Sequence, residues 1–183
     1  LASQANTQSL NGHWEFRQVG TEKWLPATVP GCNFTDLLAN ELIHDPFYRC
    51  EENNVQWIEQ QDWEYRIKFD ADSALLAKEN IDLVLEGVDT YCDIELNGTA
   101  ILSSSNMFIG HSVGCKNLLI PKNNQLLVTF RSPITQVYSQ HVKNGFTYPA
   151  ENDKSEERLS VYTRKAPYHY GWDWGPRFVT SGI

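Results

Sequence analysis

Ten residues near the C-terminal end of the sequence combine side chains that could bind a sugar. The segment Tyr168–Arg177 has the sequence YHYGWDWGPR, in which Asp173 lies between Trp172 and Trp174. The flat apolar faces of indole rings can lie against the C–H face of a sugar ring, and an ionised carboxylate can accept hydrogen bonds from two neighbouring hydroxyls. This combination suits carbohydrate. The alternative is that the Trp residues are buried around a Gly-Pro turn and serve packing.

The backbone of this segment is expected to turn. Gly171 and Gly175 let the chain bend sharply, and Pro176 fixes its own φ and cannot donate to a strand ladder, so we expect a strand end or a tight corner and not a helix. If residues 172–174 were fully extended, the two indoles would lie on one face and Asp173 on the other. One sugar could then touch the acid and both indoles only if the backbone bends between them.

Neighbouring side chains are candidates for supporting this segment. His169 can hydrogen-bond a sugar hydroxyl, or it can hold Tyr168 or a backbone carbonyl. Arg177 can pair with an acid or cover an aromatic face, and we expect structural pairing. Arg164 and Lys165 lie just upstream and are expected to hold the segment in place through backbone carbonyls.

No motif in the sequence indicates catalysis by this chain alone. There is no G-x-S-x-G elbow, no phosphate-binding glycine loop and no H-E-x-x-H pair, and the five histidines lack metal-ligand spacing. We therefore expect no metal ion and no cofactor. Glycoside hydrolysis uses a pair of carboxyl groups, but the spacing of the scattered acids selects no pair. Four acids of one polar stretch could form a metal or catalytic cluster, but we expect a solvated charge run: Glu151, Asp153, Glu156 and Glu157.

The composition is that of a globular domain with an acidic surface. The 183 residues are enough for one domain with a sizeable core. The chain has 15 basic and 23 acidic residues, a net charge of −8, and the basic residues form no cluster, so nucleic acid and anionic membranes are not expected as partners. No stretch approaches the roughly 20 apolar residues that span a bilayer.

The cysteines and two asparagines carry possible modifications. No C-x-x-C pair occurs, and a domain of this size does not need disulfides, so we expect isolated buried thiols. The four cysteines are Cys32, Cys50, Cys92 and Cys115. Asn33 (N-F-T) and Asn97 (N-G-T) match the acceptor pattern for N-glycosylation, which matters only in a eukaryotic secretory pathway.

Alternation of apolar and polar residues predicts short strands with one buried face. The clearest is residues 63–69, where Trp, Tyr, Ile and Phe share one face and Glu, Arg and Lys share the other. Asn97-Gly98 directly follows another alternating run and predicts a type I′ hairpin, because both central positions of that turn need positive φ. The expected strands cover residues 14–19, 24–29, 63–69, 81–85, 92–96 and 126–130.

The remaining stretches predict short helices and loops. Asn33 or Thr35 can cap a helical stretch that runs to Leu38, and residues 74–78 form a plausible helical turn. The less regular stretches are expected to be a polar loop at 45–54, a helix or ordered loop at 133–143, a mobile surface loop at 144–158, and extended chain from 159 onward. These spacings indicate an all-β fold of two antiparallel sheets packed face to face, a jelly-roll-like β-sandwich with short helical excursions.

Seven motifs give the sequence a resemblance to a known family. They occur in the order seen in β-mannosidases of glycoside hydrolase family 2. The motifs are Val29-Pro30-Gly31-Cys32, Asp45-Pro46-Phe47-Tyr48, Gln56-Trp57-Ile58, Asp62-Trp63-Glu64-Tyr65, Leu85-Glu86-Gly87-Val88-Asp89-Thr90, Asn106-Met107-Phe108, and Gly171-Trp172-Asp173-Trp174-Gly175-Pro176 with Ser181-Gly182-Ile183. From about Leu10 onward, the chain resembles the N-terminal sugar-binding-type domain of these enzymes.

The resemblance implies an architecture and an activity. Residues 1–183 would form a single galactose-binding-domain-like jelly roll, followed in the whole enzyme by an immunoglobulin-like domain and a (β/α)₈ barrel. Such an enzyme removes terminal non-reducing β-D-mannose with retention of configuration, using two glutamates of the barrel. No catalytic residue is therefore expected in this chain, which should be inactive alone. The resemblance also implies a location outside the cytoplasm, in the bacterial periplasm, outside the cell or in the lysosome.

The resemblance also implies roles for residues of the segment Tyr168–Arg177, which we call the Trp segment. Asp173 resembles the residue that reaches sugar hydroxyls near the barrel mouth, with Trp172 beside it, and Trp174 is expected to pack in the sandwich or against the barrel. By resemblance, the motif W-D-W-G-P favours a β-mannoside substrate over the β-galactosides and β-glucuronides of related enzymes. After the D-P-F-Y motif the chain has Glu51-Glu52 where family members often have Asn-Glu, which leaves any pocket role of that loop open. Two alternative functions are a free-standing carbohydrate-binding module and a purely structural scaffold domain.

Overall fold

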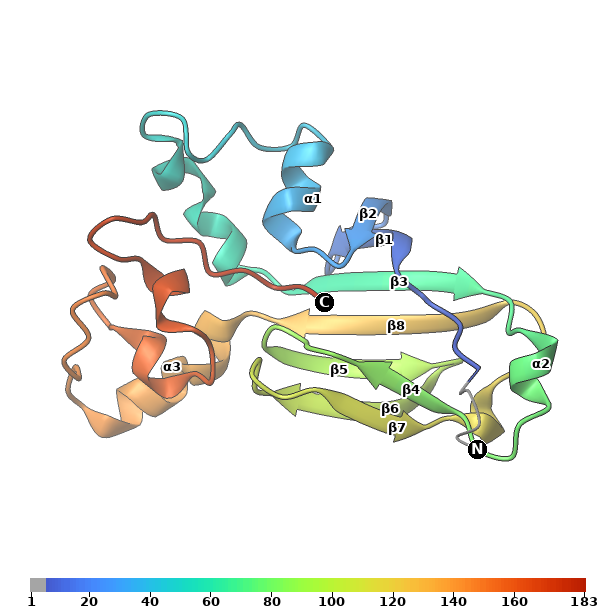
Figure 1. Cartoon of the computed structure of the whole chain (residues 1–183). Helices are drawn as coiled ribbons and strands as arrows, with labels where there is room; N and C mark the ends of the chain where they lie inside the picture. The colour runs from blue at the N-terminus through green and yellow to red at the C-terminus, as the bar shows by residue number, and fades with distance from the viewer. Residues whose placement is uncertain (1–5) are drawn as a thin grey trace.

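The structure is a computed structural model that describes residues 6–183, and it contains two antiparallel sheets (Figure 1). The larger sheet has the strand order β2 (Leu25–Val29), β1 (Gly12–Gln18), β3 (Trp63–Phe69), β8 (Asn124–Arg131), β5 (Tyr91–Leu96) and β6 (Thr99–Ser105). The smaller sheet pairs β4 (Asp82–Leu85) with β7 (His111–Gly114). The predicted all-β class with antiparallel pairing is confirmed.

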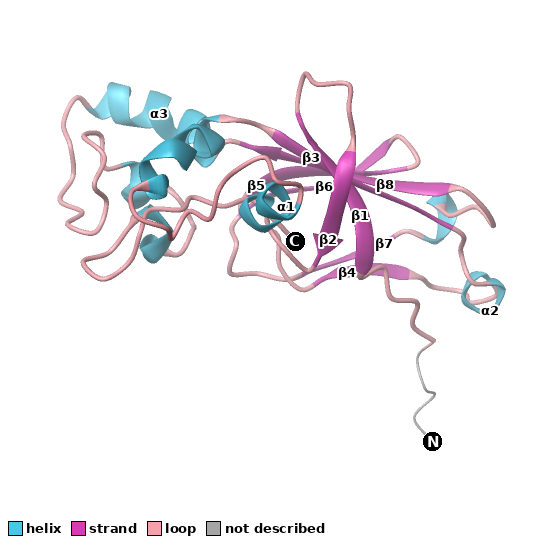
Figure 2. Cartoon of the chain, turned by 90° about the horizontal axis from the view of Figure 1, so that it is seen from above, coloured by secondary structure: helices cyan, strands magenta, loops and turns pink. Residues whose placement is uncertain are grey.

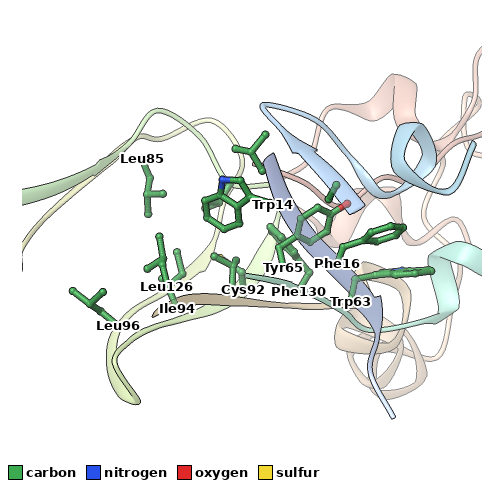
Figure 3. Packing of buried hydrophobic residues seen from close by; sticks show 14 of the residues in the cluster. Trp14, Phe16, Trp63, Tyr65, Leu85, Cys92, Ile94, Leu96, Leu126 and Phe130 are labelled. Atoms are coloured by element: carbon green, nitrogen blue, oxygen red, sulfur yellow. The ribbon is translucent and has the colours of Figure 1, made fainter. Parts of the chain in front are cut away.

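The core lies between the two sheets and follows the predicted alternation. Phe16, Tyr65, Ile94 and Phe130 come from four strands of the larger sheet and are fully buried. Figure 3 shows them in one layer, with Leu85 of β4 on the opposite side. Aromatic rings pack edge to face, as in the Tyr65–Phe130 pair with centroids 5.8 Å apart. In β5 and β8 one residue in two is buried, and this alternation fixes the register of the central strands.

The predicted hairpin between β5 and β6 is confirmed. Asn97 has a φ of 51° and Gly98 a φ of 78°, the two positive values that a type I′ turn requires. The side chain of Asn97 also donates to the carbonyl of Leu118 at 2.7 Å and accepts from the backbone N–H of Gln125 at 2.8 Å. The turn residue therefore also ties the hairpin to the start of β8.

Helices gather mostly at one end of the sheets, as Figure 2 shows from above. The α-helices are α1 (Asn33–Ala39), α2 (Ser73–Leu76) and α3 (Pro133–Asn144), and the 3₁₀ helices are η1 (Glu51–Gln60), η2 (Lys116–Leu118), η3 (Leu159–Tyr162) and η4 (Pro167–Tyr170). The helix expected from Asn33 or Thr35 is capped by Cys32. Thr35 contributes by accepting the backbone N–H of Cys32 at 3.2 Å, whereas Asn33 uses its side chain elsewhere.

Two stretches differ from the sequence-based expectation. The second half of the expected loop 45–54 enters η1, whose buried Val55, Ile58 and Glu59 have helical spacing. The chain after Leu159, expected to be extended, instead forms η3 and η4, the latter with Pro167 at its first position. Proline suits the first turn of a helix because the N–H that it lacks would have no partner there.

The thiols and the two acceptor asparagines have individual environments. Among the residues that the structure describes, all four cysteines are free: Cys92 and Cys115 are buried as expected, Cys32 is half-buried and Cys50 is exposed. Asn33 is buried and accepts the N–H of Ser181 at 3.1 Å, so the folded domain has no room for a glycan on its amide, whereas Asn97 is exposed.

Candidate functional site

The Trp segment forms a tight exposed turn at the helical end of the molecule (red in Figure 1). The backbone N–H of Trp172 donates to the carbonyl of Gly175 at 3.1 Å, and Gly171 has a φ of 106°. The backbone therefore bends between the indoles, as simultaneous contact with one ligand would require. Trp172 is 39% exposed and Trp174 is 78% exposed, so neither ring belongs to the core of the sandwich.

Asp173 lines a shallow hollow of about 260 Å³. The other residues that line it are Pro46, Phe47, Arg49, Glu52, Lys154, Trp174, Gly175 and Pro176. Trp174 thus shares the hollow with the acid, whereas Trp172, expected beside it, is not among the lining residues. The hollow combines an aromatic face, two carboxylates and two cations, which supplies both acceptors and donors for a hydroxyl-rich ligand.

Arg177 forms a buried ion network behind the hollow. Its guanidinium donates to both oxygens of Glu59 at 2.9 and 3.1 Å and to Asp153 at 2.6 Å, and it lies over the ring of Tyr170. The expected pairing with an acid is therefore present, together with the aromatic contact. Burial raises the pKa of Glu59, while the hydrogen bonds and charge of Arg177 act in the opposite direction.

Asp153 does not belong to a solvated charge run. It is 2% exposed, and in addition to Arg177 it accepts the backbone N–H groups of Ser155 at 3.1 Å and Ser160 at 2.9 Å. A buried carboxylate needs such partners, because an unpaired buried charge is strongly destabilising. Asp153 is therefore an organising residue of the 144–158 loop. Glu151 and Glu156 are exposed and Glu157 is half-buried.

A second buried ion pair holds the chain after the Trp segment. The ammonium of Lys165 contacts the carboxylate of Asp89 and donates to the carbonyl of Thr180 at 2.9 Å. Lys165 thus holds a backbone carbonyl, as expected. Burial lowers the pKa of Lys165, and the charge and hydrogen bonding of Asp89 oppose this effect. Arg164 is exposed, and only its backbone carbonyl makes a hydrogen bond, accepting from Met107 at 3.1 Å, among the residues described.

His169 supports the backbone and does not line the hollow. Its Nδ1 lies 3.2 Å from the carbonyl of Phe178 and 3.1 Å from the hydroxyl of Thr180, and its ring stacks on Tyr168 with centroids 4.7 Å apart. Burial, followed by the charge of Lys165, lowers the pKa of His169. This geometry corresponds to the backbone-carbonyl alternative.

Sequence reasoning missed several residues of this site. Arg49 and Lys154 line the hollow, and Glu59 and Asp89 bind the two buried cations, but none of these four was a candidate. Glu52, whose loop was left open as part of a pocket, also lines the hollow. The D-P-F-Y motif was a signal for Arg49 and Glu52, since Arg49 follows it directly and Glu52 lies four residues after its last residue. Within residues 6–183, no group of three or more His, Cys, Asp and Glu side chains is placed to hold a metal ion. In the same residues, no helix has the length and apolar character that crossing a bilayer requires.

The chain matches a family of carbohydrate-active domains. The family model described as glycosyl hydrolase 2 galactose-binding domain-like matches residues 14–183. A β-mannosidase B of Thermothelomyces thermophilus is 37% identical over 180 residues, which cover 94% of this chain and 20% of that protein. The β-mannosidase of Mus musculus is 33% identical over 179 residues, 96% of this chain and 20% of that protein. The chain therefore spans about a fifth of the length of these relatives.

Solved structures show the same fold. A β-D-mannosidase from Dictyoglomus thermophilum superposes with a TM-score of 0.86 at 42% identity, over 94% of this chain and 21% of that one. An exo-chitosanase from Amycolatopsis orientalis gives a TM-score of 0.60 at 17% identity, over 69% of this chain and 17% of that one. The second likeness concerns the fold alone.

Proposed function

The chain belongs to the glycosyl hydrolase 2 galactose-binding domain-like family, and on this premise we propose that it is the N-terminal domain of a retaining exo-β-mannosidase. Support comes from relatives that are 31–42% identical over 94% or more of this chain, all of them named β-mannosidases. The substrate would be terminal non-reducing β-D-mannose. The location outside the cytoplasm rests on the resemblance alone.

The domain would shape the glycone pocket and would not perform the chemistry. The observation that carries this proposal is the exposed Asp173 in a hollow with Trp174. Its carboxylate can accept hydrogen bonds from two neighbouring sugar hydroxyls, while the indole covers an apolar sugar face. The nucleophile and the acid/base of a retaining glycosidase are two carboxyl groups about 5–5.5 Å apart. We place both in the remainder of the enzyme, so the chain alone is inactive.

The face around the hollow would contact the catalytic barrel. Phe47 and Trp174 line the hollow, Tyr168 belongs to the same C-terminal segment as Trp174, and each of the three side chains is more than half exposed. A cluster of exposed aromatic side chains is typical of a surface that another domain covers. Trp174 would then lie between the two domains, next to the bound sugar.

The test is the variant Asp173→Asn in the full-length natural polypeptide that carries this chain. Charge-assisted hydrogen bonds contribute about 1.5–3 kcal/mol, so kcat/KM for an aryl β-mannoside should fall about 10- to 150-fold. Glu22→Gln, an exposed acid in the β1–β2 loop, is the control and should leave kcat/KM unchanged. Unaltered kcat and KM in Asp173→Asn would contradict the proposal and favour a scaffold domain.

The exposure of both indoles also makes a free-standing carbohydrate-binding module a second candidate. Titration of the 183-residue chain with mannose or mannobiose, followed by Trp fluorescence, separates the two functions. Saturable binding with a Kd below about 1 mM would favour the module, because a single wall of a pocket leaves most of a sugar in water. We expect no saturable binding in this range.

A further inference from the structure

We infer that the 3₁₀ helix η1 positions the Asp173 carboxylate, and that Glu52 and Gln56 are the positioning residues. The inference rests on the proposed function of Asp173, and it concerns how that side chain is held. Within residues 6–183, the carboxylate of Asp173 makes no hydrogen bond of its own. Its location is therefore set by the backbone of the turn that carries it.

One end of that turn is held by η1 through the backbone N–H, the backbone carbonyl and the guanidinium of Arg177. Glu52 accepts the backbone N–H of Arg177 at 2.8 Å, and Gln56 donates to its backbone carbonyl at 3.0 Å. Glu59 binds the guanidinium with both carboxylate oxygens. All three residues belong to η1, and their contacts converge on Arg177. Three residues of η1, each more than 115 positions before Arg177 in the sequence, thus hold Arg177 in place.

The other end of the turn is held by close packing. A Cβ at Gly171 would lie 3.1 Å from the carbonyl of Asn152, so the backbone packs closely against the 144–158 loop at this glycine. The hydrogen bond from Trp172 to Gly175 then closes the turn. The backbone that carries Asp173 is therefore held at residue 171 on one side and at residue 177 on the other.

The contact between Glu52 and Arg177 lies close to Asp173 in sequence, so loss of this contact should lower the rate of mannoside hydrolysis. A substrate contact needs an oxygen placed to within a fraction of an ångström, and a misplacement of about 1 Å can reduce a rate 100-fold. Loss of the Glu52 contact frees the N–H that follows Pro176, four residues beyond Asp173. Glu52 also lines the hollow, so direct contact of Glu52 with the sugar is the competing explanation.

A double-mutant cycle separates positioning from direct contact. In the full-length polypeptide, kcat/KM for an aryl β-mannoside is measured for Glu52→Ala, for Asp173→Asn and for the double variant. If Glu52 acts through Asp173, Glu52→Ala lowers kcat/KM by about tenfold or more when Asp173 is present. The same change lowers it less than about twofold in the Asp173→Asn background, because a carboxylate that is already absent cannot be misplaced.

Two further variants and a control support the interpretation of that cycle. Glu52→Gln keeps an oxygen that accepts the N–H of Arg177, so it should restore most of the activity that Glu52→Ala loses. Gln56→Ala removes the contact to the carbonyl and should show the same coupling to Asp173 without altering a charge. Glu51→Ala is the matched control, because in the part of the chain that the structure describes the Glu51 side chain accepts a hydrogen bond only from its neighbour Asn54, and it should leave kcat/KM unchanged.

The possible outcomes distinguish the inference from the proposed function. The inference would be overturned if Glu52→Ala lowered kcat/KM equally in both backgrounds, or in neither. The proposed function would still stand in that case, provided that Asp173→Asn by itself lowers kcat/KM. Full activity of Asp173→Asn would overturn both. Should Glu52→Ala fail to fold, as thermal unfolding would show, the cycle with Gln56→Ala tests the same coupling to Asp173.

Discussion

Replacing Arg177 by Met should destabilise the domain more than any other change of a single charge in the Trp segment. The substitution keeps an unbranched side chain of similar length but removes the cation from a buried site. Glu59 and Asp153 have side chains 8% and 0% exposed, so both carboxylates would lose their cationic partner without gaining water. Breaking a buried ion pair in this way costs about 3–5 kcal/mol.

The magnitude can be compared with a second arginine in the same chain. Arg131 also bonds a carboxylate through two nitrogens, but the Arg131 and Asp93 side chains are 46% and 39% exposed. An exposed pair contributes about 0–1 kcal/mol. Arg131→Met is therefore a matched control that differs from Arg177→Met chiefly in burial.

The assay is urea unfolding of the 183-residue chain, followed by Trp fluorescence at pH 7. With about 2–4 °C per kcal/mol for a domain of this size, Arg177→Met should also lower Tm by about 6–20 °C, and Arg131→Met by less than about 4 °C. Similar losses in the two variants would refute the reasoning, because burial would then make no difference to the value of the ion pair.

The effect of pH on this variant has a definite sign. Burial raises the pKa of Glu59 and Arg177 lowers it, so loss of Arg177 raises that pKa further. A carboxyl with a raised pKa in the folded state contributes most to stability below its unfolded pKa, about 4.3, and loses that contribution as pH rises through the folded value. The deficit of Arg177→Met relative to the unaltered chain should therefore shrink from pH 7 to pH 5.

Two further changes test other parts of the fold. Burial and the charge of Lys165 lower the pKa of His169, so its neutral form contributes stability above about pH 6.5, and this contribution is lost as pH falls through the folded pKa. His169→Asn should therefore weaken the loss of stability in acid. The measurement is the urea midpoint between pH 7.5 and 5, and parallel pH profiles of the variant and the unaltered chain would disprove the prediction. Gly182→Ala would place a Cβ 2.1 Å from the carbonyl of Gly31 and should cost about 1–3 kcal/mol or more, whereas a Tm equal to that of the unaltered chain would show that the C-terminal segment is not packed as described.

The strands could be predicted because the signal for them is local. Alternation from Trp63 to Phe69 and from Cys92 to Leu96 coincides with alternating burial in β3 and β5, and Asn97-Gly98 specifies its own turn. Each of these features depends on residues that are adjacent in sequence.

The buried ion network could not be predicted because its partners are distant in sequence. Asp153 stands among exposed acids and polar residues, and nothing nearby distinguishes it from Glu151 or Glu156. Its burial depends on Arg177, 24 residues away, and that of Glu59 on a partner 118 residues away. Pairings of this kind are set by tertiary packing and leave no periodic pattern.

The role of Asp173 in binding sugar stays a prediction, whereas the structure shows where this residue and its neighbours lie. The segment with Asp173 was singled out from its residue types, and the structure places this acid at a surface hollow. Which indole shares the hollow depends on how the turn bends, and the hydrogen bond from Trp172 to Gly175 that bends it has no local signature beyond the glycines. The result is that Trp174 lines the hollow.

The proposal that this domain supplies one wall of a mannose-binding pocket through Asp173 can be tested by crystallography. The decisive experiment is a crystal structure of the full-length natural polypeptide with a mannose-configured inhibitor bound. We expect an Asp173 oxygen about 2.5–3.0 Å from a hydroxyl of the terminal sugar, with Trp174 at its side. A sugar bound in the catalytic centre with no contact to the turn at residues 172–176 would contradict the proposal.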